Sequence, residues 1–193
     1  MDLDVVFVGT AGSAPTPARG LPAVLVRRGG DRLLFDCGEG TQRQLLRSVG
    51  LVDLEEVFVT HFHADHVLGL PGMLKTFSLR GRDRPLTVYG PRGLRDLFVV
   101  LRPLVGRLPF ELSLVELEPN QELRRDGYRI AAFKTAHGVP ACGYALVEDE
   151  RLGRFDESRA RELGVRPGPD FGRLHRGQPV PGSAGEVRPE QVV

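Results

Sequence analysis

Three of the chain's five histidines lie beside an aspartate in one short stretch, VTHFHADHVLGLPG, at residues 59–72. Along an extended segment, side chains two positions apart point the same way, so His61 and His63 project together. Asp65 and His66 come from the turn that follows. Imidazole and carboxylate groups together suit zinc or a similar borderline metal. The spacing therefore predicts a metal site.

The number of ligands in this stretch favours two metal ions over one. Four side chains in a single tight turn are more than one tetrahedral ion takes from one peptide with good geometry. Two ions that share ligands fit better, because such a pair clamps both the attacking and the leaving oxygen of a displacement and makes hydroxide available near neutral pH. The alternative is a surface loop that is rich in histidine by chance. The H-x-H-x-D-H spacing at a strand end argues against that alternative.

Alternating strands and helices surround the histidine stretch. β-Branched runs bounded by Gly and Pro are typical of strands. The spacing of Leu94, Leu97, Phe98 and Leu101 is that of one helix face, and Pro91 suits the first turn of that helix. The expected strands lie at 4–10, 22–28, 31–36, 54–61, 85–90, 110–117, 128–135 and 142–148, and the expected helices at 39–50, 66–80 and 91–106. The pattern predicts a mixed α/β (α+β) fold.

The sequence changes character at about residue 150. From there it is rich in charged residues, Gly and Pro, and poor in aliphatic residues. A helix is expected around 156–163, ended by Gly164. The remainder has too few apolar residues to form a core of its own. We therefore expect an exposed arm or a frayed tail after the main domain.

Composition and charge narrow the possible classes of protein. Hydrophobic residues make up 41% of the chain, as in globular proteins, and no apolar run reaches the length of a membrane span. The N-terminus lacks the features of a secretory signal. Two cysteines cannot form a disulfide framework, so a cytoplasmic location is expected. A net charge of +1 argues against a protein that coats nucleic acid indiscriminately.

Positive charge is nevertheless concentrated after the histidine stretch. Residues 75–107 contain eight basic and two acidic residues, a balance of 8 − 2 = +6. One interpretation is a solvated helix face. The other is a surface that binds phosphate groups. The basic residues are Lys75, Arg80, Arg82, Arg84, Arg92, Arg95, Arg102 and Arg107.

The H-x-H-x-D-H stretch resembles the metal-binding motif of the metallo-β-lactamase superfamily. This resemblance implies an αββα sandwich with its metal site along one edge of the two sheets. It also implies that His137, in KTAHGVPACGY, is a further metal ligand, and that Asp36, in LLFDCGEGTQRQLL, orients the metal-binding loop through hydrogen bonds. We interpret Cys37 as a small buried residue, because no basic neighbour lowers its pKa. We interpret His175 as solvated or facing phosphate groups.

Further stretches narrow the resemblance to the ribonuclease Z family. They are FVGTAGSAPTPARG, LLFDCGEGTQRQLL, VFVTHFHADHVLGLPGML, LTVYGPRGL and TAHGVPACGY. The segment RFDESRARELGVRPGPDFGRLHRG resembles the protruding arm of that family, with its motif at Gly168 and Pro169. The family implies a zinc-dependent endoribonuclease that removes the 3′ trailer from precursor tRNA by metal-hydroxide attack on a phosphodiester. In the family the arm grips tRNA away from the cut.

The resemblance also implies roles for the site residues. His61, His63 and His137 would hold one zinc ion, and Asp65 and His66 would help to hold the second of a pair in each subunit of the complete enzyme. Asp65 is the carboxylate best placed to accept a proton from the attacking water. The partners implied are precursor tRNA and a second copy of the chain in a homodimer, with no membrane.

Two features depart from the family pattern. Arg19 is followed by Gly20, where the family commonly has asparagine. The chain also ends at Val193, before the second half that in the family supplies a bridging aspartate and a late histidine. The sandwich is therefore expected to be present as an incomplete N-terminal portion plus the protruding arm.

These expectations divide the chain into three parts. Residues 1–149 would be the N-terminal part of the domain, 150–181 the tRNA-binding arm, and 182–193 the start of a return to the core. Two alternatives to the tRNA nuclease stay open. One is another metal-dependent hydrolase of the same fold, of the arylsulfatase or phosphodiesterase type. The other is an inactive truncated fragment that lacks the remaining metal ligands.

Overall fold

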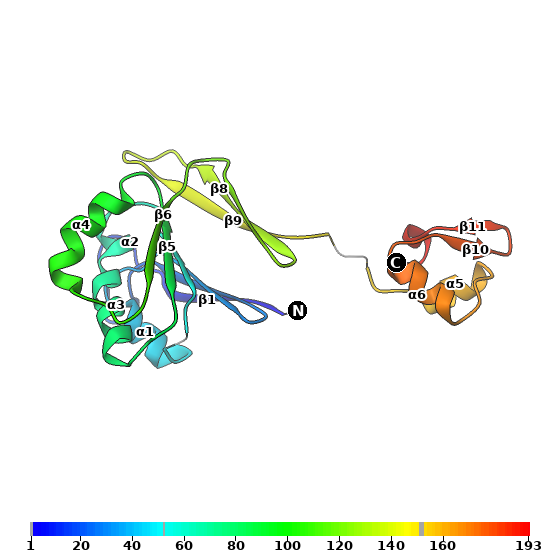
Figure 1. The fold of residues 1–193 in the computed structure, drawn as a ribbon, viewed down its shortest axis with the longest axis horizontal. Coiled ribbons are helices and arrows are strands. Elements are labelled where there is room, and N and C mark those ends of the chain that lie inside the picture. The colour runs from blue at the N-terminus through cyan, green and yellow to red at the C-terminus, as the bar shows by residue number, and fades with distance from the viewer. Residues whose placement is uncertain (1, 52, 151–152) are drawn as a thin grey trace. The chain divides into compact units, whose positions relative to one another are not determined.

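The structure is a computed structural model that describes residues 2–51, 53–150 and 153–193. The chain divides into two units, Met1–Val147 and Glu148–Val193 (Figure 1). Residues 151 and 152, which follow the expected boundary at residue 150, lie outside the described residues.

Six strands form the larger sheet of the first unit, in the order β1–β2–β3–β4–β5–β6. The pairs β1–β2 and β2–β3 are antiparallel, whereas β3–β4, β4–β5 and β5–β6 are parallel. Parallel strands end at the same edge of a sheet, so the loops after β3, β4, β5 and β6 open at one edge, where ligands of such sheets commonly bind. The bounds are Leu3–Gly9, Ala23–Arg28, Asp31–Phe35, Glu56–Phe58, Leu86–Gly90 and Leu112–Glu116.

A second, three-stranded sheet packs against the larger one. Its strands are β7 (Glu122–Arg125), β8 (Tyr128–Lys134) and β9 (Cys142–Glu148), in that order. An apolar cluster that includes Phe58 of the larger sheet and Ile130 of the smaller one fills the space between them. β7 has no apolar alternation that would predict a strand, because its sequence ELRR is polar. This strand forms by antiparallel pairing with β8.

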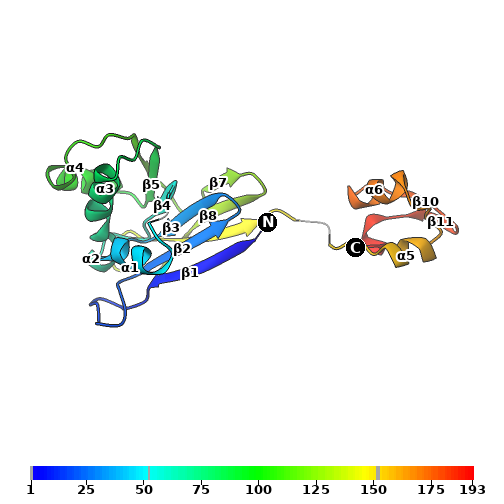
Figure 2. The same cartoon turned by 90° about the horizontal axis from the view of Figure 1, so that it is seen from below.

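Four helices cover the other face of the larger sheet, so the first unit has a helix layer, a sheet and a second sheet (Figure 2). They are α1 (Thr41–Ser48), α2 (Ala64–Val67), α3 (Gly69–Leu79) and α4 (Leu94–Val105). The largest apolar cluster lies between this layer and the sheet. The expectation that Pro91 occupies the first turn of α4 is wrong, because that helix begins at Leu94, after Gly93 with a φ of 100°.

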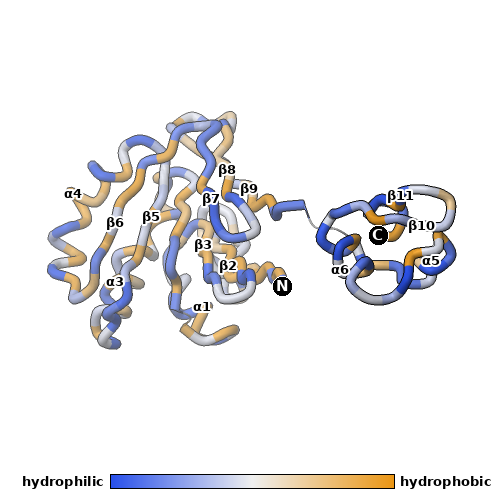
Figure 3. Tube along the Cα trace, turned by 45° about the vertical axis from the view of Figure 1, so that its right-hand side comes forward, coloured by the Kyte–Doolittle hydropathy of each residue, from blue (hydrophilic) through white to orange (hydrophobic). Residues whose placement is uncertain are grey.

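Hydrophobic residues alternate with hydrophilic ones along the elements of the first unit (Figure 3), as expected for strands and helices with one buried face. On α4, Leu94, Phe98 and Leu101 are buried and Leu97 packs against the same cluster, as their spacing predicts. Within the described ranges, no helix is both long and apolar enough to cross a lipid bilayer.

The second unit has a small core, which its sequence pattern does not predict. Its elements are α5 (Glu157–Glu162), α6 (Pro169–His175), the hairpin of β10 (Val180–Gly182) and β11 (Gly185–Val187), and the 3-10 helix η1 (Pro189–Gln191). Isolated apolar side chains, spread over the segment, gather into one cluster. The cluster consists of Ala160, Val165, Leu174, Val180, Val187 and Val192.

Two sequence expectations for this region therefore change. The expectation that the segment cannot form a core of its own is wrong, because single apolar residues far apart in sequence meet through the turns between short elements. Residues 182–193 were expected to begin a return to the main core. The structure instead packs Val187 and Val192 with Leu174 of the same unit.

Candidate metal centre

The histidine stretch lies at the edge of the larger sheet, directly after β4. His61 and His63 follow the strand, and α2 begins at Ala64 with His63 preceding it as a residue of β conformation. His61 is buried, with 8% of its surface exposed. His137 reaches the same place from the loop between β8 and β9.

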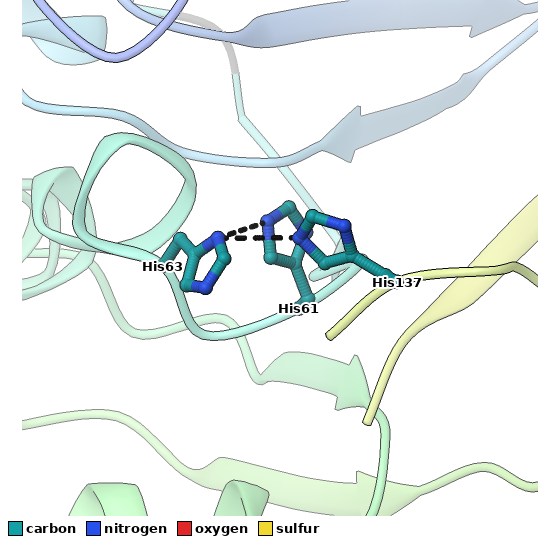
Figure 4. Close-up of side chains that lie close together, drawn as sticks. All are labelled: His61, His63 and His137. Carbon is teal, nitrogen blue, oxygen red and sulfur yellow. Dashed lines mark hydrogen bonds between the residues drawn. The ribbon is translucent and has the colours of Figure 1, made fainter. Parts of the chain in front are cut away.

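Three imidazoles converge at this edge (Figure 4). His61 Nε2 lies 3.1 Å from His63 Nδ1, and His137 Nε2 lies 3.2 Å from the same His63 nitrogen. The three ring nitrogens all lie within 4.8 Å of one another. The structure thus brings together residues that are 74 positions apart in the sequence.

Asp36 joins the histidine stretch to the loop after β3. Its carboxylate accepts hydrogen bonds from the Thr60 backbone N–H at 2.8 Å and from the Thr60 hydroxyl at 3.0 Å. Its Oδ2 lies 2.7 Å from His66 Nδ1. Asp36 is buried and has a φ of 59°, which is unusual for a residue other than glycine. Strained backbone of this kind persists where the surrounding structure holds it, often at functional sites.

These hydrogen bonds determine which imidazole nitrogens remain available. Thr60 donates its only hydroxyl proton to Asp36, so its oxygen accepts from His61 Nδ1, 2.9 Å away. His66 donates from Nδ1 to Asp36. Both rings therefore keep Nε2 as an acceptor, which is the form in which neutral histidine binds a metal.

Asp65 lies beside His66. Its Oδ2 accepts a hydrogen bond from the Ser13 backbone N–H at 3.0 Å and lies 3.6 Å from His66 Nε2. Asp65 and His66 therefore form a second group of donor atoms next to the three convergent imidazoles. The rings of His61 and His66 have centroids 4.1 Å apart.

The turn can approach the β3 loop only because two positions lack a side chain. A Cβ atom on Gly38 would lie 2.3 Å from the Asp65 carbonyl oxygen, and one on Gly69 would lie 2.1 Å from the Gly38 carbonyl oxygen. Backbone hydrogen bonds from Cys37 N to His66 O and from Gly69 N to Cys37 O, at 2.8 and 2.9 Å, fix this contact.

The smaller sheet is also attached to the histidine stretch. The Cys142 backbone N–H donates to Thr60 O at 2.9 Å, and the Tyr144 hydroxyl donates to Val59 O at 2.9 Å. Both residues belong to β9, the strand that follows the loop carrying His137. These bonds place His137 opposite His61 and His63.

The environment shifts several pKa values. Burial lowers the pKa of His61 to about 4, and the neighbouring His66 and His137 add to this effect. The hydrogen bond to Asp36 raises the pKa of His66. Partial burial opposes ionisation of Asp65, but the hydrogen bond from Ser13 and the nearby His66 outweigh it and lower its pKa. Burial raises the pKa of Cys37 to about 12, in agreement with a buried thiol that is not a nucleophile.

The donor set fits a metal ion. The three imidazole nitrogens that face one another lie close enough together to bind one cation. Imidazole suits zinc and similar transition metals, and an adjacent carboxylate adds a harder ligand. The hydrogen bonds that His66 and Thr60 donate to Asp36 are of the type that orients metal-binding histidines.

The basic run of residues 75–107 serves more than one purpose. Arg82 is buried and donates to the carbonyl oxygens of Leu54 and Pro85, so it is structural. Arg84 pairs with Asp53 and Glu55. Lys75 is half-buried, and the other members remain exposed. Among the exposed members, Arg92 lines a cavity beside His137. Only part of the run is therefore available to phosphate groups.

The remaining predicted residues lie in the second unit. Gly168, with a φ of 133°, precedes α6, and Pro169 is the first residue of that helix, a position that suits proline. The ring of His175 lies 6.0 Å from that of Phe155. Sequence reasoning missed Thr60 and the backbone of Ser13. A threonine directly before the first histidine could have suggested the former, but a backbone donor has no sequence signal.

Comparison with known proteins agrees with this geometry. Residues 17–151 match the family model of the metallo-β-lactamase superfamily, and the chain therefore belongs to that superfamily. Within it, the chain is similar to human tRNase Z, short form. That comparison has 32% identity and a TM-score of 0.68, and it covers 88% of this chain and 72% of the human one. The chain is thus a member of the ribonuclease Z branch, as its motifs predict, and the mixed α/β fold class is confirmed.

Curated relatives support the same placement. Ribonuclease Z of Methanosarcina mazei is 47% identical over 99% of this chain, and that of Halobacterium salinarum is 48% identical over the whole chain. The chain spans 63% and 64% of the length of these two relatives.

Proposed function

We propose that this chain carries the metal centre of a zinc-dependent endoribonuclease that removes the 3′ trailer from precursor tRNA. The observation that carries the proposal is the convergence of His61, His63 and His137 at one sheet edge, in a chain that is similar to ribonuclease Z over nearly its whole length. His61, His63 and His137 would hold one zinc ion, and Asp65 and His66 would help to hold a second. A bound zinc pair supplies Lewis acidity and lowers the pKa of water near the scissile phosphate.

Residues of the chain would carry out the other steps. Asp65, whose Oδ2 lies 3.6 Å from His66 Nε2, would accept a proton from the attacking water. Asp36 would hold the His66 and His61 rings through the hydrogen bonds described above. The neighbouring basic side chains would bind the phosphates on either side of the cut.

We assign tRNA binding away from the cut to the second unit, over residues 150–181, with Gly168 and Pro169 starting α6. Arg159, Arg161 and Arg173 pair with carboxylates on their own helices. By contrast, Arg154, Arg166 and Arg176 form no ion pair within the described part of the unit, so their charge is available to phosphate groups. Residues 182–193 would complete this unit.

The complete enzyme is proposed to be a cytoplasmic homodimer. Both cysteines of this chain are free and buried, which agrees with a reducing compartment. Light scattering on protein expressed from the full reading frame would give a dimer mass, and a monomer active on tRNA would exclude this part of the proposal.

Cleavage of a precursor tRNA with a 3′ trailer tests the main proposal. Protein from the full reading frame should contain about two zinc ions per subunit and should release the trailer. Asp65→Asn should abolish cleavage yet leave tRNA binding in a gel shift largely intact, because binding relies on basic residues elsewhere. Full activity in a preparation free of metal would contradict the proposal. Cleavage of a small phosphodiester without any cleavage of tRNA would favour a different hydrolase of the same fold.

The arginines of the second unit allow a matched comparison. Replacing Arg154, Arg166 and Arg176 by Ala should weaken tRNA binding and reduce the slope of log K against log salt, by about 0.7–0.9 for each phosphate that the protein no longer neutralises. Replacing the paired Arg159, Arg161 and Arg173 removes equal charge and should have a smaller effect. Hydrolysis of bis(p-nitrophenyl) phosphate should not change in either variant. Equal effects of the two triple variants would argue against the assignment.

A further inference from the structure

A cavity of about 460 Å³ opens beside His137. It lies among three loops, which follow β5, follow β6 and join β8 to β9. β4, β5 and β6 run parallel, so these loops open at the same sheet edge as the histidine stretch. A ligand in this cavity, which we call the His137 pocket, would therefore lie next to the candidate metal centre.

The pocket combines an apolar interior with a cationic rim. Leu117 and Cys142 in its lining are buried, with 5% and 2% of their surface exposed, and Pro119, Val139 and Pro140 add apolar surface. Arg92 and Lys134 also line it, and both are exposed. Neither cation forms an ion pair within the ranges that the structure describes. Glu118 is the acidic residue of the lining, so the cations outnumber it.

This pairing of surfaces matches one class of ligand. Exposed Arg and Lys side chains that form no ion pair bind phosphate through charge-assisted hydrogen bonds. An apolar wall of Pro and Val side chains accepts the flat face of a nucleobase, because contact between them removes apolar surface from water. The volume lies within the range that proteins use for a single small ligand, about 300–1,000 Å³. A sugar or a bare phosphate would use only one of the two surfaces.

We propose that the His137 pocket binds one unpaired nucleotide of the RNA, with its phosphate on Arg92 and Lys134 and its base against Pro119, Val139 and Pro140. The inference rests on the proposed function, which makes RNA the substrate. Taking a base out of a duplex costs a few kcal/mol, so the pocket favours a nucleotide that is already single-stranded. It would thereby place a single-stranded flank of the scissile bond at the metal centre.

Nucleotide binding can be measured without turnover. Isothermal titration of the full protein with a nucleoside 5′-monophosphate, with inorganic phosphate and with the nucleoside separates the contributions of phosphate and base. The monophosphate should bind more tightly than either part. Arg92→Ala with Lys134→Ala should weaken monophosphate binding by roughly tenfold. Arg80→Ala with Arg107→Ala removes the same charge outside the pocket and should change the affinity less than twofold.

A second variant tests the apolar part of the pocket. Val139→Trp would fill the cavity, so the advantage of the monophosphate over inorganic phosphate should disappear while phosphate binding stays unchanged. A monophosphate that binds no more tightly than inorganic phosphate in the unaltered protein would overturn the inference. So would an unchanged advantage in Val139→Trp. If either result occurred together with normal trailer cleavage, it would contradict the pocket assignment alone and leave the proposed function supported. Nucleotide binding without any cleavage of tRNA would contradict the proposed function and leave the pocket assignment supported.

Discussion

His66 Nδ1 lies 2.7 Å from the Asp36 carboxylate, and this hydrogen bond joins the histidine stretch after β4 to the loop after β3. The same carboxylate binds the hydroxyl and the backbone N–H of Thr60, which in turn orients His61. One buried side chain thus fixes two imidazoles of the candidate centre.

Asp36→Asn should therefore lower metal affinity by about 10- to 100-fold, the usual effect of losing a group that orients a ligand. Asparagine keeps the size of the side chain but cannot accept all of these hydrogen bonds. Competition with a chromophoric chelator measures the affinity. Asp4→Asn, which breaks the exposed pair with Arg27, serves as the control. An Asp36→Asn protein that binds metal as tightly as this control would show that Asp36 does not act on the ligands.

Gly38→Ala should reduce the free energy of unfolding by about 1–3 kcal/mol, the usual effect of overpacking. The added Cβ would lie 2.3 Å from Asp65 O and 2.5 Å from the Leu21 Cβ, so the backbone must shift. Urea unfolding gives the change. Gly12→Ala, whose Cβ would meet nothing within 4 Å, should differ little from the unaltered protein. Equal stabilities of the two variants would mean that the turn relaxes at no cost.

The two thiols should be unreactive in the folded protein. Cys37 is fully buried and its pKa is raised to about 12, so almost none of it is thiolate at pH 8. Cys142 is 2% exposed and burial also raises its pKa. Iodoacetamide should label neither residue under native conditions and both in denaturant, as read by mass spectrometry. Rapid native labelling of Cys37 alone would reveal opening of the loop after β3.

Leu174→Ala should unfold the second unit and leave the first intact. Leu174 is fully buried in the second unit's cluster, and such a truncation costs about 2–5 kcal/mol. A segment this short has little stability to lose. Limited proteolysis followed by mass spectrometry should show rapid cleavage after residue 152 and a resistant fragment of residues 1–147. Arg176→Ala, at an exposed position, is the control. Cleavage spread over both units would contradict their independence.

The sequence predicts most of the first unit because its elements have strong local patterns. The eight expected strands and three expected helix regions all contain elements. The region 66–80 is interrupted at Leu68, between α2 and α3, and α3 then runs without a break through Gly69, Pro71 and Gly72. Local sequence patterns do not predict the elements that form only through tertiary contacts. β7 is polar and forms only against β8, and the core of the second unit consists of single apolar residues brought together by turns.

In the candidate metal centre, too, local sequence patterns predict some residues and tertiary contacts bring in the others. Spacing alone indicates His61, His63, Asp65 and His66, because they are close in sequence. His137 is a lone histidine between two strands, and it is only the family resemblance that points to it. Thr60 and Ser13 N were missed because their contribution depends on the positive φ of Asp36 and on the path of the loop after β1.

The attachment of β9 to the histidine stretch has a thermodynamic consequence. Cys142 N–H and the Tyr144 hydroxyl hold β9 to Thr60 and Val59, and His137 precedes that strand. An ion that binds His137 together with His61 therefore bridges the two sheets, and its binding energy adds to the energy of their docking. At a free metal concentration of 100 times Kd this linkage amounts to about 2.7 kcal/mol. Amide exchange in β8 and β9 should consequently report the free metal concentration around the protein, slowing as it rises and quickening under chelation.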